Sequence, residues 1–178
     1  AQWFGGSNPV WYVREDVATA PGNEYYGYLK FDNLTSGRMY FGVGASVAGG
    51  CVSVVAATNT SATAGLMIQD NRPGFGFITV TQIPFAWTEG VWYRLAAEWS
   101  AAGEIRAKVY DETGANLLAD TGFANVGLLN AGGIAMRAFP STSASSAATI
   151  SFDTITKAGG APTCEPDITT GAIPGQPG

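Results

Sequence analysis

The sequence predicts an all-β protein in which two antiparallel sheets pack face to face as a β-sandwich of the jelly-roll kind. Many short segments alternate apolar and polar residues, which is the period of a β-strand and not that of a helix. Clusters of Gly, Ser, Thr, Asn and Asp separate these segments, as turns do. Strands with one apolar side must bury that side, and a second sheet is the simplest partner.

The clearest segment is a hairpin within residues 90–114. Its apolar side is predicted to hold Tyr93, Leu95, Ala97, Trp99, Ile105, Ala107 and Val109. Its polar side is predicted to hold Arg94, Glu98, Arg106, Lys108 and Tyr110. We therefore expect the first side to face the core and the second to be exposed.

The other strands are expected to follow the same parity rule. They are predicted at residues 24–33, 38–45, 51–57, 65–70, 75–83, 133–139 and 148–156. After Lys157 the chain becomes rich in Gly and Pro and loses its alternation, so it is not expected to enter a sheet. This predicts one domain over residues 1–158 and a linker or tail over 159–178.

The composition restricts the function classes. Only 13% of the residues are charged, the net charge is −5 and the pI is near 4.5. Nucleic acids and anionic membranes need a basic stripe, so neither is an expected partner. The chain has no His, which removes the usual Ser and Cys triads and the common zinc sites.

The chain has two cysteines, Cys51 and Cys164, which lie far apart in the sequence. One interpretation is a disulfide that ties the tail to the domain, stabilising it by roughly 4–5 kcal/mol through loop closure. The alternative is two unconnected thiols, with Cys51 a small buried residue.

The second half of the domain resembles a known family. The phrases GVWYRLAAEW, GEIRAKVYDETG, GGIAMRAF and ATISFDTIT resemble laminin-G-like and concanavalin-like jelly rolls over roughly residues 88–157. The tail segment CEPDITTGAIPGQPG resembles the start of a dockerin-like repeat. These resemblances imply a secreted, extracellular and modular bacterial protein, and a fold that serves lectins, carbohydrate-binding modules, glycosidases, lyases and adhesion domains.

The leading hypothesis is a monomeric, non-catalytic module that binds a polysaccharide or other glycan. Sugar rings stack on aromatic side chains, and their hydroxyl groups bond to polar ones. The predicted ligand residues are Trp3, Trp11, Tyr12, Tyr26, Tyr28, Asp70, Asn71, Arg72 and Trp87. The competing interpretation for each ring is that it belongs to the core, where aromatic residues are common.

Two other classes remain open. A polysaccharide hydrolase needs two opposed carboxylates, and a lyase needs a base beside cations, for which Glu98 and Tyr110 are the candidates. The chain shows no paired-carboxylate motif, and Glu98 beside Arg94 is expected to form a surface ion pair, so no catalytic residue is assigned. A structural or adhesion domain is the third possibility. No cofactor is required, but the family resemblance implies that Asp153 either binds a structural Ca²⁺ or faces solvent.

Overall fold

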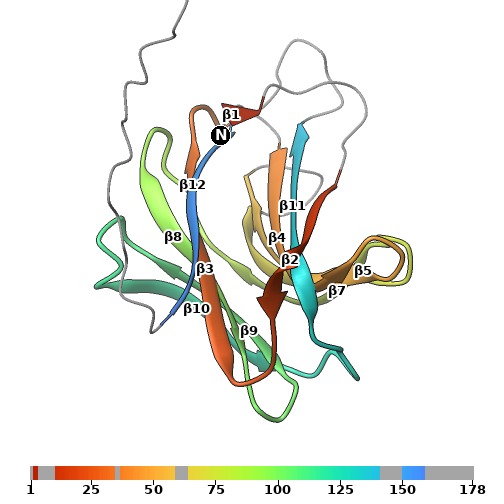
Figure 1. Ribbon diagram of the computed structural model, residues 1–178. Helices are drawn as coiled ribbons and strands as arrows, with labels where there is room; N and C mark the ends of the chain where they lie inside the picture. Colours follow the sequence, from red (N-terminus) through yellow and green to blue (C-terminus); the bar gives the residue numbers. More distant parts are fainter. Residues whose placement is uncertain (1, 4–10, 35–36, 59–63, 141–149, 159–178) are drawn as a thin grey trace, which may run out of the picture.

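The computed structural model confirms the all-β prediction. It describes the backbone of residues 2–3, 11–34, 37–58, 64–140 and 150–158, and their side chains except at 2–3, 139–140 and 150–156. In this part of the chain all regular structure is β, arranged as two antiparallel sheets (Figure 1). No helix long and apolar enough to cross a membrane occurs in the described residues. The predicted tail at 159–178 lies outside them.

Each sheet has six strands. Sheet A contains, in spatial order, β1 (Gln2–Trp3), β12 (Ile150–Lys157), β3 (Asn23–Phe31), β8 (Trp92–Trp99), β9 (Ile105–Tyr110) and β10 (Leu117–Ala124). Sheet B contains β2 (Tyr12–Thr19), β11 (Gly132–Pro140), β4 (Gly37–Ser46), β5 (Gly50–Ala57), β6 (Gly65–Asn71) and β7 (Ile78–Pro84). Each sheet therefore combines strands from both halves of the chain, as a jelly roll requires.

The core lies between the two sheets, and strand parity determines which residues enter it. The hairpin side chains predicted to be apolar, from Tyr93 to Val109, are all buried there. Sheet B contributes the alternate residues of its central strands: Met39, Phe41, Val43, Val52, Val54, Leu66 and Ile68. The alternation of the hairpin sequence therefore identified the inner face of β8 and β9 correctly.

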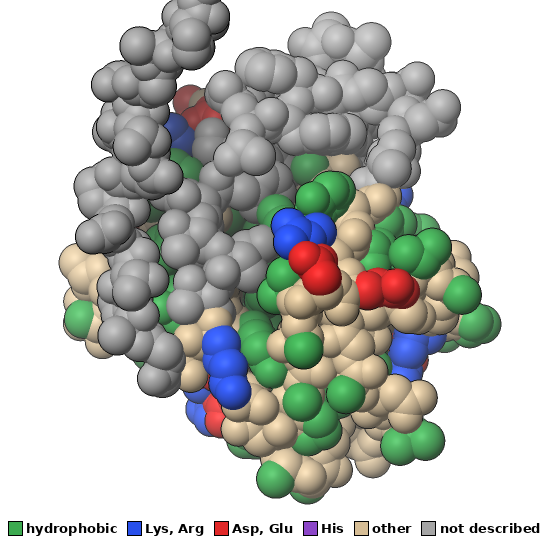
Figure 2. All heavy atoms as spheres, viewed as in Figure 1, with side chains coloured by type: hydrophobic (Ala, Val, Ile, Leu, Met, Phe, Trp, Pro, Cys, Tyr) green, Lys and Arg blue, Asp and Glu red, His purple; other side chains and the backbone are tan. Residues whose placement is uncertain are grey.

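The outer surface is poor in charge, as the composition predicts. Figure 2 shows small groups of acidic and basic side chains separated by wide areas of apolar or uncharged polar atoms. One pair in the described residues is Arg14 with Asp16 on the edge strand β2, with nitrogen and oxygen 2.5 Å apart. The places where polar or aromatic groups gather on the two outer sheet faces are therefore the candidates for function.

Candidate functional site

The outer face of sheet B carries a row of side chains in direct cross-strand register. Arg137 of β11 pairs with Tyr40 of β4, Tyr40 with Val55 of β5, and Val55 with Met67 of β6. All four are buried although they point away from the core between the sheets. Tyr40, Val55 and Met67 form an apolar cluster of their own, with Trp11 packed against it. This face is therefore covered by other side chains.

Three aromatic residues outside the strands provide part of that cover. Trp11 precedes β2, and its ring centre lies 5.4 Å from that of Tyr40 and 4.8 Å from that of Phe75. Phe77 precedes β7 and lies 6.1 Å from Tyr40. The segment between β6 and β7 thus folds over the sheet to meet Trp11. We call Trp11, Tyr40, Phe75, Phe77 and Arg137 the aromatic face.

Arg137 lies among these rings. Its guanidinium carbon is 4.6 Å from the ring centre of Phe77, 5.2 Å from that of Tyr40 and 5.5 Å from that of Trp11. Such contacts are favourable because the ring face attracts a cation. Burial lowers the pKa of Arg137 from its usual value, and the nearby positive charge of Arg38 lowers it further. The aromatic face therefore holds a partly desolvated positive charge.

Gln69 of β6 adds a polar group to the same side of the sheet. It lies opposite Ser53 of β5, and its Nε2 donates a hydrogen bond of 3.1 Å to Oγ1 of Thr79. Its Oε1 is buried and has no hydrogen-bond partner in the part of the chain that the structure describes. An unsatisfied buried acceptor is costly, and a donor from a bound ligand would satisfy it.

The aromatic face has the composition of a binding surface for a molecule with both apolar and polar sides. Phe77 is 54% exposed and Trp11 is partly exposed, so their rings are open to a ligand. Arg137 and Gln69 are polar groups on the same side of the sheet, and both are buried beneath the aromatic cover. Small-molecule sites commonly combine apolar and aromatic lining with a few placed polar groups.

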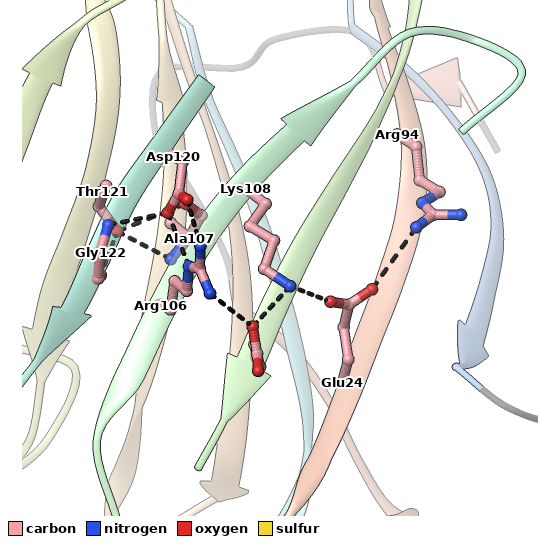
Figure 3. Close-up of polar contacts among 9 residues, drawn as sticks. Glu24, Arg94, Arg106, Ala107, Lys108, Asp120, Thr121 and Gly122 are labelled. Atoms are coloured by element: carbon pink, nitrogen blue, oxygen red, sulfur yellow. Dashed lines mark hydrogen bonds and ion pairs between the residues drawn. The ribbon is translucent and has the colours of Figure 1, made fainter. Parts of the chain in front are cut away.

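The outer face of sheet A is different, because its ions neutralise one another (Figure 3). We call Glu24, Arg94, Glu98, Arg106, Lys108 and Asp120 the charged face. Lys108 Nζ lies 2.6 Å from Glu24 and 2.5 Å from Glu98, and Arg94 lies 3.5 Å from Glu24. Arg106 pairs with Glu98 and, more closely, with Asp120. The hydrogen bonds from Arg106 hold the pKa of Asp120 at about 2. The polar side of the hairpin, which was predicted to be exposed, is therefore mostly buried: its charged side chains are 11–29% exposed because they pair with one another.

Two predicted ligand residues lie beside the charged face. Tyr26 is buried to 9% exposure, and the Arg94 guanidinium stacks between it and Tyr110, at 4.5 and 4.3 Å from the two ring centres. Tyr28 is half-buried and meets Tyr26 edge to face. Tyr26 is therefore committed to holding Arg94, whereas part of Tyr28 remains exposed.

Trp87 was expected on the surface, but it lies in the core. It is 6% exposed and packs against Phe31, Phe85 and Tyr93, with ring centres 4.6–5.4 Å away. Its Nε1 donates to the carbonyl oxygen of Gly65 at 3.3 Å. The segment after β7 turns this ring inward, so we assign it no ligand role.

The predicted polar loop also serves the fold. Asn71 is fully buried and donates from Nδ2 to the carbonyl of Gly76 at 2.6 Å. Asp70 pairs with Arg72 at 2.8 Å, and hydrogen bonds from Arg72 lower the pKa of the Asp70 carboxyl. Arg72 also donates to the backbone carbonyls of Val126 and Leu128. These contacts fix the loop that places Phe75 and Phe77.

The remaining predicted residues are placed as follows. Tyr12 is 60% exposed on the edge strand β2, on the opposite side from Trp11. Trp3 and Asp153 belong to β1 and β12, but their side chains lie outside the described residues. No group of three or more acidic or Cys side chains that suits a metal ion is found among the described residues.

Cys51 is buried on the outer side of sheet B, with Sγ 3.3 Å from Oγ of Ser53. Burial raises the pKa of this thiol to about 12. Cys164 lies outside the described residues, so the disulfide stays a prediction.

Sequence reasoning did not single out Tyr40, Phe77 and Arg137. The alternation in GGIAMRAF does place Arg137 opposite the core residues Ile134 and Ala138, so its side of the strand was readable. The sequence could not predict which residues meet on the outer face of sheet B, because they come from β4, β6, β11 and two loops.

No protein-family model and no curated protein matches the chain. Solved structures do. The carbohydrate-binding module CBM66 from Bacillus subtilis is 14% identical, with a TM-score of 0.53 over 85% of this chain and 92% of that one. Congerin II with bound lactose and MES is 10% identical, with a TM-score of 0.57 over 84% and 99%.

A glycosyl hydrolase family 16 protein from Mycobacterium smegmatis is 15% identical, with a TM-score of 0.51 over 79% of this chain and 65% of that one. At such identities the likeness concerns the fold. The chain therefore shares the jelly-roll β-sandwich with a carbohydrate-binding module, a lactose-binding protein and a family 16 protein.

Proposed function

We propose that this domain is a non-catalytic carbohydrate-binding module and that it holds a polysaccharide on the aromatic face. The observation that carries the proposal is the position of Phe77 and Trp11, two partly exposed rings beside the Arg137 guanidinium. A sugar ring would stack its apolar side on these rings, and the buried Arg137 guanidinium would hold the rings in place through its contacts with their faces. The named sugar-binding proteins of the same fold support this class of ligand.

The charged face supports binding less well. Its cations are already paired with carboxylates, and Tyr26 and Tyr110 are stacked on Arg94. A ligand that used these groups would first have to break ion pairs that are half-buried. On the aromatic face, a ligand can contact the exposed rings without breaking an ion pair.

The same contacts weigh against the enzymatic alternatives. A lyase on this face would use Tyr110 as base and Arg106 and Lys108 to neutralise a uronate. Both cations instead contact carboxylates of the chain, and the Glu98 carboxylate is itself paired with Arg106 and Lys108. We therefore propose binding without turnover.

The wider context of the proposal comes from the sequence. A charge-poor acidic surface, the laminin-G-like phrases and the dockerin-like tail favour a module of a secreted, extracellular multidomain protein. In this proposal the domain acts as a monomer, with a structural Ca²⁺ near Asp153 as an accessory feature and with neither nucleic acid nor membrane as partner.

Affinity electrophoresis against a panel of neutral and acidic polysaccharides tests the proposal. Reducing-sugar and ultraviolet lyase assays are run on the ligands that retard the protein. The proposal expects retardation by at least one polysaccharide and no product above the rate without protein. Turnover that is lost in Glu98→Gln or Tyr110→Phe would establish an enzyme instead, and no retardation by any glycan would reject the proposal.

A further inference from the structure

We infer that the glycan bound on the aromatic face is a neutral polysaccharide, whose sugars carry neither carboxylate nor sulfate groups. The inference rests on the proposed function and adds the chemical class of the ligand. It follows from where the positive charges of the chain lie and from what they contact.

Most positive charges of the chain are engaged with its own carboxylates. The chain has nine Lys and Arg residues, and all of them lie in the part that the structure describes. Six of them lie within ion-pair distance of an Asp or Glu: Arg14, Lys30, Arg72, Arg94, Arg106 and Lys108. Figure 3 shows three of these, Arg94, Arg106 and Lys108, in one chain of contacts. An acidic ligand could pair with these cations only by displacing a carboxylate of the protein.

The other three cations are no better placed to receive a negative group. Arg137 is 7% exposed, its Nε and Nη1 atoms are buried, and three rings contact its guanidinium carbon. Arg38 is half-buried and has an interaction of its own within the chain. Lys157 is exposed, but it ends β12 in sheet A and therefore lies away from the aromatic face.

The groups that a ligand can reach on the aromatic face are apolar or uncharged. Phe77 is 54% exposed, and Trp11 and Phe75 are partly exposed. Thr79, two residues after Phe77, is exposed and accepts a hydrogen bond from Gln69, so its own hydroxyl proton is available to a sugar. Residues 39–69 and 73–88, which include β5, β7 and most of β4 and β6, contain no Asp, Glu, Lys or Arg.

Such a surface favours a neutral ligand for a physical reason. A carboxylate or sulfate that loses water against an apolar ring needs an ion pair to compensate for the lost hydration. The charge of Arg137 lies beneath the rings, and its attraction through water weakens with distance and is screened by salt. A neutral sugar stacks its C–H face on a ring and keeps its hydroxyl groups hydrated, so it has no such cost. The net charge of −5 adds a weak repulsion of anions.

Calorimetry with two derivatives of one polysaccharide tests the inference. The tightest neutral polysaccharide of the panel is converted into its hydroxyethyl ether and, at an equal degree of substitution, into its carboxymethyl ether. The two substituents are similar in size, and only the second is charged. We expect the carboxymethyl ether to bind at least tenfold more weakly than the hydroxyethyl ether. The affinity of the underivatised polysaccharide should stay within twofold between about 20 mM and about 500 mM NaCl, because no ion pair is formed.

A variant that adds a reachable cation locates the ligand on the protein. Thr79→Lys places an ammonium group beside the exposed rings, and we expect it to raise the affinity for the carboxymethyl ether at least tenfold. Ala102→Lys is the matched control, because it adds the same charge at an exposed position in the turn between β8 and β9 of sheet A. It should change that affinity by less than twofold. The melting temperature confirms that both variants are folded, and the comparison of the two ethers on the unaltered protein does not depend on either.

The outcomes separate this inference from the proposed function. If the tightest ligand of the panel is acidic, or if the carboxymethyl ether binds less than tenfold more weakly than the hydroxyethyl ether, the inference is wrong and the proposed function stands. If the folded Thr79→Lys variant changes the affinity no more than Ala102→Lys does, the ligand is not on the aromatic face. If no polysaccharide binds at all, the proposed function itself is rejected.

Discussion

The guanidinium carbon of Arg137 lies 4.6 Å from the ring centre of Phe77, although their strands lie near opposite edges of sheet B. Arg137 belongs to β11, and Phe77 precedes β7 at the far edge. The contact exists because the segment between β6 and β7 folds back over the outer face, where Phe75 also meets Trp11. Residues distant along the chain thereby form one aromatic surface around a single positive charge.

Replacing Trp87 by alanine should lower the stability of the domain, and it should not remove a contact with the ligand. Trp87 fills the core between Phe31, Phe85 and Tyr93, so Trp87→Ala is expected to lower the free energy of unfolding by about 3–5 kcal/mol. Trp92→Ala is the control, because Trp92 is half-buried at the surface beside Lys30. Urea unfolding measures both, and equal losses in the two variants would contradict the assignment of Trp87 to the core.

The pair between Arg106 and Asp120 should make stability depend on pH in the acid range. The pKa of Asp120 is about 2 in the folded protein and about 3.9 in an unfolded chain. The pair therefore stabilises the fold above about pH 4, and this contribution is lost as the pH falls through the folded value.

Unfolding of the unaltered protein and of Asp120→Asn between pH 2 and pH 6 measures this contribution. Near pH 6 the variant should be less stable by about 0.5–1 kcal/mol, as expected for a partly exposed ion pair. The difference should shrink toward pH 2, where about half of Asp120 is protonated in the folded protein. A difference that stays constant over the whole range would mean that the ion pair is not its source.

Cys51 should be unreactive in the native protein. Its side chain is fully buried, and burial raises the pKa of the thiol to about 12, so little thiolate forms near neutral pH. A thiol reagent should not modify Cys51 before the protein is unfolded. If Cys51 is bonded to Cys164, the unfolded and unreduced protein will also show no free thiol, whereas two titratable thiols would exclude the disulfide.

The sequence predicted the inner side of the hairpin strands β8 and β9 because an apolar core enforces alternation. It missed three edge strands: the two-residue β1, and β2 and β10 for two different reasons. In β2 both sides are largely exposed, so YVREDVAT shows no apolar side to recognise. In β10 two shifts of register, near Leu117 and after Asp120, break the alternation of LLADTGFA.

The binding surface was harder to predict than the fold. Trp11 was recognised as a candidate, but its neighbours Tyr40 and Arg137 come from strands that are brought together only by sheet pairing. Trp87 resembles a spare aromatic in the sequence because it follows Pro84 outside any strand, yet the chain turns it into the core. Composition shows that aromatic residues are available, and only tertiary structure shows which of them are exposed.

The most direct test of the account compares one ring from each outer face. Phe77→Ala removes an exposed ring of the aromatic face, and Tyr28→Ala removes a half-buried ring beside the charged face. Calorimetry with the tightest polysaccharide of the panel measures the affinity of each variant, and the melting temperature confirms that each is folded. The account predicts that Phe77→Ala binds at least tenfold more weakly, a loss of about 1.4 kcal/mol, and that Tyr28→Ala binds as the unaltered protein does. Loss of binding in Tyr28→Ala with full affinity in Phe77→Ala would contradict it and move the ligand to sheet A.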